Sequence, residues 1–102
     1  MDTYEIVRAV VEHFRDAHED GTVEEIASLI SNSQVSDVYR ELDRLANGML
    51  IVASYRRTPG FRRVRVYGPS RWVLAVLLET ASAHGSLDHE IHEIVEGYQN
   101  CK

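Results

Sequence analysis

Two helical patterns separated by a short polar break constrain this chain more than any other feature of its sequence. The first pattern begins with the spacing of a capping box, in which the Thr22 hydroxyl caps the helix and the Glu25 side chain reaches back. Its apolar stripe follows at helical spacing, at Ile26, Leu29 and Ile30. We therefore expect a short helix whose start is fixed by its own side chains.

A second, longer helix is expected after Ser31, Asn32 and Ser33, which favour turns and helix caps. The apolar side chains that recur there at intervals of three and four residues are Val35, Val38, Leu42, Leu45 and Met49. The pattern predicts a helix over residues 34–47, with Ser33 as its cap and Gly48 as its left-handed stop.

The segment after this helix has the pattern of a β-hairpin. Residues 50–57 and 62–67 are rich in Val, Ile and Tyr. Residues 58–61 between them, Thr-Pro-Gly-Phe, suit a turn with Pro second and Gly third. In the second strand, valines alternate with two arginines and a tyrosine, so we expect the two sets on opposite faces.

Further helices are expected on both sides of these elements. An amphipathic helix over residues 4–17 ends at Asp20 and Gly21, a second helix over residues 71–84 follows a cap at Ser70, and a last helix follows a cap at Ser86. With 102 residues, the chain has the size of one domain. The expected fold is mainly α with a β-hairpin.

Positive charge is concentrated in the middle third of the chain. The net charge is −5, yet residues 38–72 hold eight Arg against Glu41 and Asp43, whereas residues 1–37 hold two Arg against nine acids. Arginine suits phosphates and guanine edges because its guanidinium group is a planar fork of donors. The basic middle third therefore favours an anionic partner, although the total charge argues against simple adhesion to nucleic acid. The alternative is that GC-rich coding alone produces the bias toward arginine.

The sequence of residues 22–45 resembles the winged helix-turn-helix of bacterial and archaeal transcription regulators, the broad ArsR, MarR and PadR-like group. The resemblance covers about residues 3–68. The residues that carry it are Ala27, Ser33, Val38, Tyr39, Arg40, Leu42 and Leu45. It implies a winged helix-turn-helix DNA-binding core over residues 1–68 and C-terminal dimerisation helices over residues 69–102, all within one compact domain.

By this resemblance, residues 34–47 are a recognition helix in the major groove, and an arginine-rich wing over residues 56–63 contacts the backbone or the minor groove. The implied DNA-binding residues are Gln34, Ser36, Asp37, Tyr39, Arg40 and Arg44 of the helix and Arg56, Arg57, Arg62 and Arg63 of the wing. Asp37 departs from the pattern, because phosphates repel an acid unless it accepts from cytosine N4 or orients Arg40. Ordinary surface pairs with Asp37 and Glu41 are the alternative for Arg40 and Arg44.

The C-terminal third is expected to form the interface of a homodimer. Residues 72–78 are apolar on nearly every side, which is more than a small core can cover. The expected interface residues are Trp72, Leu74, Leu77, Leu78, Leu87, Ile91, Ile94, Val95 and Tyr98. The sequence leaves open which helices pair, and the alternative is a core within one chain. A two-fold dimer would place its recognition helices about 34 Å apart and imply a palindromic site.

Other chemistry has little support in the sequence. His89 and His92 have a chelating spacing near Glu93 and Glu96, but two histidines do not make a site, so we expect neither a metal nor another cofactor. Cys101, the single cysteine, has redox chemistry available only across a dimer. The sequence has no Gly-rich phosphate loop, GxSxG or HExxH motif, and we expect no enzyme.

These observations together predict a sequence-specific regulator that binds double-stranded DNA, a homodimeric repressor of prokaryotic or archaeal type. We expect it in the cytoplasm with no membrane partner, because no apolar run is long enough to span a bilayer and the first residues lack the basic region of a secretory signal. The alternative, from a different class, is a winged-helix module that binds a protein through its hairpin or its acidic first helix, without DNA.

Overall fold

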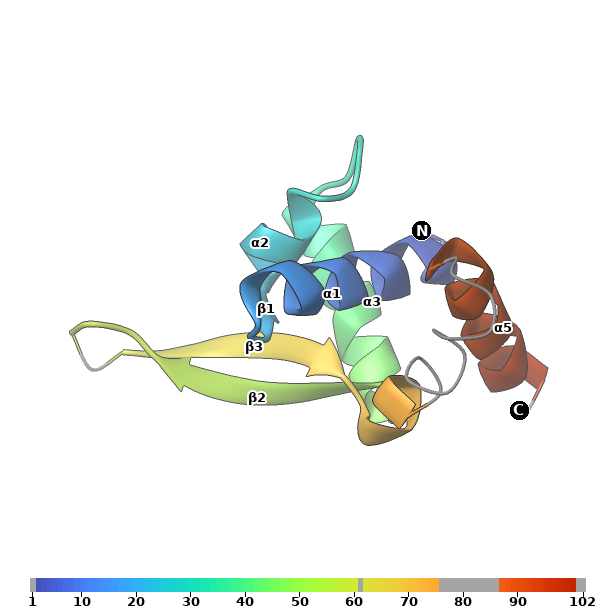
Figure 1. Cartoon of the computed structure of the whole chain (residues 1–102). Helices are drawn as coiled ribbons and strands as arrows, with labels where there is room; N and C mark the ends of the chain where they lie inside the picture. Colours follow the sequence, from blue (N-terminus) through green and yellow to red (C-terminus); the bar gives the residue numbers. More distant parts are fainter. Residues whose placement is uncertain (1, 61, 76–86, 101–102) are drawn as a thin grey trace.

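The helices of this chain pack around the base of a long β-hairpin, which projects from one end of the molecule (Figure 1). The computed structural model describes residues 2–60, 62–75 and 87–100, and in the last of these ranges the side chains of residues 91–97. Its elements are α1 (Thr3–Ala17), β1 (Gly21–Thr22), α2 (Val23–Ala27), α3 (Val35–Asn47), β2 (Ile51–Arg57), β3 (Arg63–Pro69), a helical stretch at residues 71–75, and α5 (Leu87–Asn100).

Helix α1 confirms the amphipathic first helix and its predicted end at Ala17, but the residue that stops it is not the expected one. The Asp2 side chain caps its start by accepting from the Tyr4 N–H at 3.1 Å. His18 ends it in a left-handed conformation, with φ of 57°, and its N–H donates to the Phe14 carbonyl. Asp20 and Gly21 were expected at this stop, but Gly21 belongs to strand β1 instead.

Helix α2 begins with the capping box that the sequence predicts. The Thr22 hydroxyl accepts from the Glu25 N–H at 3.2 Å, and the Glu25 carboxylate accepts from the Thr22 N–H at 2.9 Å. This backbone hydrogen bond lowers the pKa of Glu25, against the opposing effect of desolvation. The helix ends at Ala27, so Leu29 lies beyond it and is 48% exposed, while Ile30 is buried.

Helix α3 has nearly the predicted bounds, and Gly48 is its C-cap as predicted, but Ser33 does not cap its start and Gly48 is not left-handed. Its N-cap is Gln34, whose side chain makes no capping bond. Ser33, the expected cap, instead donates its hydroxyl to the carbonyl oxygens of Ile30 at 3.0 Å and Ala27 at 3.3 Å. At the other end, Gly48 has φ of −84°, and Met49 takes the left-handed conformation with φ of 66°.

One side of α3 lies in the core, as the spacing of its apolar residues predicts. Val38, Leu42 and Leu45 are fully buried. Val35 and Met49 belong to the same sequence pattern but are exposed, Met49 by 81%. The helix therefore turns its remaining, largely polar sides to solvent and to the hairpin.

The predicted hairpin is confirmed, and it is part of a larger sheet than expected. Gly60 in the connecting turn has φ of 136°, which only glycine adopts readily. Strand β3 runs to Pro69, two residues beyond the expected end, and β1 pairs antiparallel with it to give the order β1-β3-β2. Strand β1 was not predicted, because a two-residue strand is too short to show alternation.

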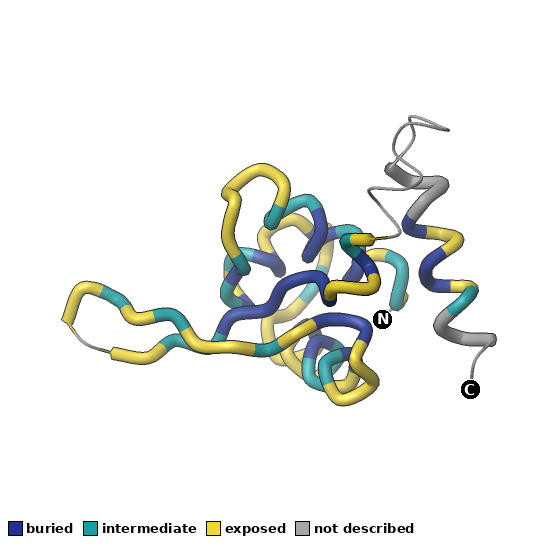
Figure 2. The backbone as a smooth tube through the Cα atoms, turned by 60° about the horizontal axis from the view of Figure 1, so that its bottom comes forward, coloured by how far each residue is buried: buried dark blue, intermediate teal, exposed yellow. Residues whose placement is uncertain are grey.

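The sheet is buried at its base and exposed at its tip (Figure 2). Val66 and Tyr67 of β3 and Ile51 of β2 are buried, whereas the residues on both sides of the turn are exposed. This gives the molecule its elongated form, with extents of 43 × 25 × 25 Å.

Helix α5 packs on α1 at the end of the molecule away from the hairpin tip (Figure 1). Ile91, Ile94 and Val95 are buried there within the single chain. Tyr4 of α1 stacks on His92, with the ring centroids 3.9 Å apart. None of the helices in the described ranges has the length and apolar character needed to cross a membrane.

The cap expected at Ser70 is confirmed by a hydrogen bond from the Val73 N–H to the Ser70 hydroxyl at 3.2 Å. The rest of the helix expected over residues 71–84 and the cap expected at Ser86 lie outside the described residues.

Gly68→Ala is expected to lower the free energy of unfolding. A Cβ at this position would overlap the carboxylate of Asp20, which lies close against β3. Overpacking of this kind costs about 1–3 kcal/mol, which urea unfolding measures directly. Gly97→Ala in α5 is the matched control, because nothing lies within 4 Å of its added Cβ, and it is expected to stabilise the helix by about 0.5–1 kcal/mol. Equal effects of the two substitutions would contradict the close approach of Asp20 to Gly68.

Candidate nucleic-acid interface

An open groove lies between the outer side of α3 and strand β3. Its volume is about 670 Å³. The lining residues are Val23 and Glu24 of α2, Val35, Ser36, Tyr39, Arg40 and Asp43 of α3, and Val64 and Arg65 of β3. The groove therefore joins the two elements that the sequence analysis assigned to DNA.

Strand register determines which hairpin side chains lie on the side of the sheet that faces α3. The partners across the ladder are Ala53 with Tyr67, Tyr55 with Arg65, and Arg57 with Arg63. Partners in an antiparallel ladder project from the same face, and alternate residues of one strand share a face. Tyr55, Arg57, Arg63 and Arg65 thus lie on the face of Tyr67, which contacts α3; we call these four residues the arginine face.

One carboxylate of α3 joins the helix to this face. Asp43 Oδ1 accepts from the Tyr67 hydroxyl at 3.0 Å and pairs with Arg65 Nη2 at 2.9 Å. Burial and this hydrogen bond raise the pKa of Tyr67 well above its ordinary value. Since Tyr67 is fully buried, the contact fixes how the base of the hairpin sits against α3.

Aromatic rings support two of the arginines. The Arg63 Cζ lies 4.6 Å from the centroid of the Tyr55 ring, and the Arg65 Cζ lies 5.4 Å from that of Tyr67. Both distances are within the range of cation–π attraction. Tyr55 is itself 57% exposed, so Arg63 and Tyr55 form an exposed stacked pair on the outer part of the hairpin.

The residues predicted on the first two turns of α3 are all at the surface. Gln34, Ser36, Asp37, Tyr39 and Arg40 are exposed, and three of them, Ser36, Tyr39 and Arg40, line the groove. Within the described residues no ion pair joins Asp37 to Arg40, so the structure gives no sign that Asp37 orients it.

Arg44 lies on another side of α3 from the groove. Its Nη2 pairs with Glu41 Oε2 at 2.9 Å and donates to the Thr3 hydroxyl of α1 at 3.0 Å. This is the ordinary surface pair that the sequence analysis offered as the alternative. We therefore leave Arg44 out of the candidate interface.

Arg56 projects from the face of the hairpin opposite the arginine face. It pairs with Glu19 at 2.7 Å and Glu25 at 3.2 Å, and it donates to the Asp20 carbonyl at 3.3 Å. These contacts tie the hairpin to the segment between α1 and α2, so Arg56 is also left out of the candidate interface. Beside it, burial raises the pKa of the Asp20 carboxyl, while a hydrogen bond with Ser54 acts in the opposite direction.

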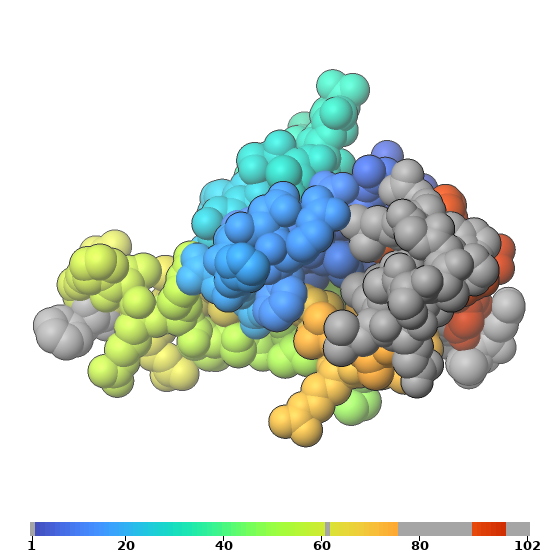
Figure 3. Space-filling model, in the orientation of Figure 1, coloured from blue at the N-terminus to red at the C-terminus, as the bar shows by residue number. Residues whose placement is uncertain are grey.

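The other predicted hairpin arginines are exposed near the tip, which projects well clear of the helices (Figure 3). None of the ion pairs within the described ranges involves Arg57, Arg62 or Arg63.

Sequence reasoning missed three members of the site, namely Asp43, Tyr55 and Arg65. The alternation along β3 already placed Arg65 with Arg63, and this signal was available in the sequence. Tyr55 and Asp43 had no such signal, because their roles depend on strand register and on a contact between residues 24 apart.

The residues expected at a dimer interface differ in their exposure in the structure. Ile91, Ile94 and Val95 are buried within one chain, Leu74 is half-buried, and Trp72 is 50% exposed. The side chains of Leu77, Leu78, Leu87 and Tyr98 lie outside the described residues, as do Cys101 and the side chain of His89. Trp72 lines a shallow hollow of about 530 Å³ together with Met49 and Val52.

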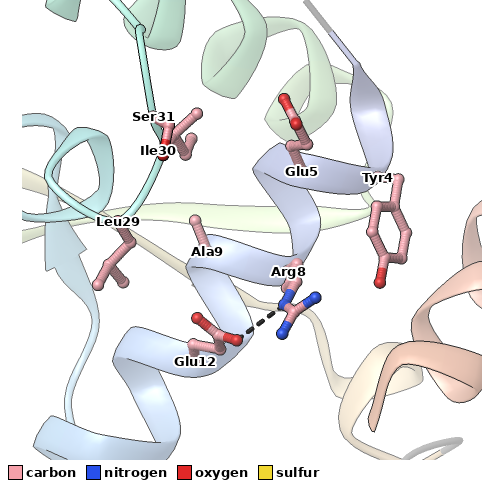
Figure 4. Close-up of a pocket in the computed structure, with 8 residues that line it drawn as sticks. All are labelled: Tyr4, Glu5, Arg8, Ala9, Glu12, Leu29, Ile30 and Ser31. Atoms are coloured by element: carbon pink, nitrogen blue, oxygen red, sulfur yellow. Dashed lines mark hydrogen bonds and ion pairs between the residues drawn. The ribbon is translucent and has the colours of Figure 1, made fainter.

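A smaller hollow of about 300 Å³ lies between α1 and the segment that follows α2 (Figure 4). Arg8 and Glu12 form an ion pair of 2.8 Å along its rim, and Leu29 faces Ala9 across it. In the described part of the chain, no three His, Cys, Asp or Glu side chains gather as metal ligands.

Replacing Asp43 is expected to lower the free energy of unfolding through the loss of its hydrogen bond with Tyr67. Asp43→Ala leaves the buried Tyr67 hydroxyl without its acceptor, which costs about 1–3 kcal/mol, whereas Asp43→Asn keeps an acceptor and costs less. In an unfolding experiment, the double variant Asp43→Ala with Tyr67→Phe should lose less stability than the sum of the two single variants. Additive losses would contradict the coupling of these residues.

Comparison of the chain with protein-family models, curated proteins and solved structures finds no match. The candidate interface therefore stands on its own geometry.

Proposed function

We propose that this protein binds double-stranded DNA as a winged helix-turn-helix regulator, with α3 as the recognition helix and the β2–β3 hairpin as the wing. The observation that carries the proposal is that Arg65 of the arginine face lines the same groove as the exposed start of α3, while the rest of the arginine face continues from it toward the hairpin tip on the same side of the sheet. Phosphates are the partner whose charge and spacing suit such a row of guanidinium groups.

The chemistry of α3 is consistent with limited reading of base edges. Arg40 suits the O6 and N7 acceptors of guanine, Gln34 suits adenine, and Ser36 pairs with either a base or a phosphate. α2 packs against α3 and braces it. The first turns of α3 are left exposed, as the part of a recognition helix that enters the major groove has to be.

Binding to a mixed-sequence duplex is expected to depend steeply on salt. Neutralisation of about four phosphates would lower the affinity about 100-fold between 50 and 200 mM salt, as followed by fluorescence anisotropy. A duplex selected from a random library should bind more tightly than the mixture if α3 reads bases. Absence of binding even at low salt would overturn the proposal and favour the alternative, a winged-helix module that recognises a protein.

We also propose that the protein acts as a homodimer, a repressor of cytoplasmic DNA. Ile91, Ile94 and Val95 are buried in the core of their own chain, and an exposed apolar surface that remains for a second copy among the described residues is formed by Trp72, Met49 and Val52. Large exposed apolar groups of this kind are typical of protein interfaces.

Trp72→Ser is expected to convert a dimer into a monomer in sedimentation velocity, because a tryptophan at an interface contributes a large share of the binding energy. Leu29→Ser is the matched control, since Leu29 is about as exposed but lies on the opposite part of the fold, beside α2. A wild-type chain that sediments as a monomer at all concentrations would contradict the dimer.

A further inference from the structure

Charge is divided unequally between the two parts of the proposed interface. The helix-turn-helix segment, residues 22–47, holds five acids against Arg40 and Arg44 and so carries a net charge of −3. The hairpin, residues 51–69, holds five Arg and no acid, a net charge of +5. The attraction to a polyanion therefore originates in the hairpin.

Ion pairs within the fold reduce the number of arginines that are available. Arg44 is engaged by Glu41, Arg56 by Glu19 and Glu25, and Arg65 by Asp43. Among the described residues, the arginines outside every ion pair on this side of the molecule are Arg40, Arg57, Arg62 and Arg63. Three of these four belong to the outer part of the hairpin.

Arg57 and Arg63 are in an arrangement that the fold alone does not favour. They are register partners in the last described pair of the ladder, and both are exposed. Like charges directly opposite each other destabilise a sheet, and no acid among the described residues pairs with either of them. Tyr55 lies under Arg63 and holds its guanidinium group on the arginine face.

The proposed DNA binding accounts for the placement of Arg57 opposite Arg63. We propose that Arg57 and Arg63 form a clamp for a backbone phosphate of duplex DNA, and that this clamp provides more of the electrostatic binding free energy than α3. A phosphate between two guanidinium groups removes their mutual repulsion and accepts charge-assisted hydrogen bonds from both. The inference rests on the function proposed above and names one of its phosphate contacts.

Acidic residues restrict what α3 contributes. Arg40 is its single arginine at the groove, and Glu24 lines the same groove. Asp37 is exposed one turn before Arg40 on the same helix. Both acids repel phosphates, so α3 approaches DNA without a large electrostatic gain of its own. The role left to Arg40 is discrimination between bases.

The clamp is tested by the salt dependence of binding to a mixed-sequence duplex. The double variant Arg57→Gln with Arg63→Gln is expected to reduce the slope of log affinity against log salt by about one, because the clamp neutralises one phosphate, and each single variant is expected to reduce it by less. Arg40→Gln is expected to leave that slope nearly unchanged while weakening binding to a selected site. Arg15→Gln is the control, because Arg15 is an exposed arginine of α1 that lines neither the groove nor the hollow at Trp72 and should change neither quantity.

A second readout does not involve DNA. Arg57→Gln removes the repulsion from Arg63, so its Tm in low salt should exceed that of the wild type by about 1–4 °C, and high salt should abolish the difference. A role confined to the fold would instead lower the Tm of this variant and leave the salt slope intact.

The outcomes separate the two proposals. If the wild type binds DNA but the slope falls with Arg40→Gln and not with the hairpin variants, the clamp is overturned and the DNA-binding function stands. If the wild type fails to bind at low salt, both are overturned. A reduced slope in both hairpin variants, with a raised Tm for Arg57→Gln, supports the clamp.

Discussion

The geometry of the proposed interface depends on one carboxylate. Asp43 projects from α3 and takes the Tyr67 hydroxyl and the Arg65 guanidinium on the same oxygen, so helix and hairpin are held at one relative position. Tyr67 is fully buried, and a buried hydroxyl that loses its acceptor is costly. The contact therefore resists rotation of the hairpin about its base. The direction of the remaining residues of the arginine face therefore depends on this contact.

A second set of ionic contacts acts on the other face of the hairpin. Arg56 reaches Glu19 and Glu25, and Glu25 also closes the capping box with Thr22. One carboxylate thus connects the start of α2 with strand β2. Since these contacts are partly exposed, each contributes modestly, and their effect lies in restricting the hairpin from the side opposite Asp43. The two faces together explain how a long hairpin keeps a defined direction.

The helices and the hairpin could be predicted from the sequence because their signals are local. The capping box at Thr22 and the spacing of Val38, Leu42 and Leu45 each depend on residues a few positions apart. Strand β1 could not be predicted, because its two residues are defined only by pairing with β3. The same limit applies to the site: nothing near Arg56 in the sequence distinguishes it from Arg57, yet strand alternation puts the first against acids and the second in solvent.

This difference between neighbouring arginines determines how the basic composition should be interpreted. A count of eight arginines in the middle third suggests a broad basic surface, but three of those on α3 and the hairpin are paired with acids that the fold itself supplies. Stabilising contacts account for the paired arginines, and no such contact in the described residues accounts for Arg57 opposite Arg63. The repulsion between Arg57 and Arg63 lowers the stability of the chain, and an anionic partner bound to both would remove this repulsion.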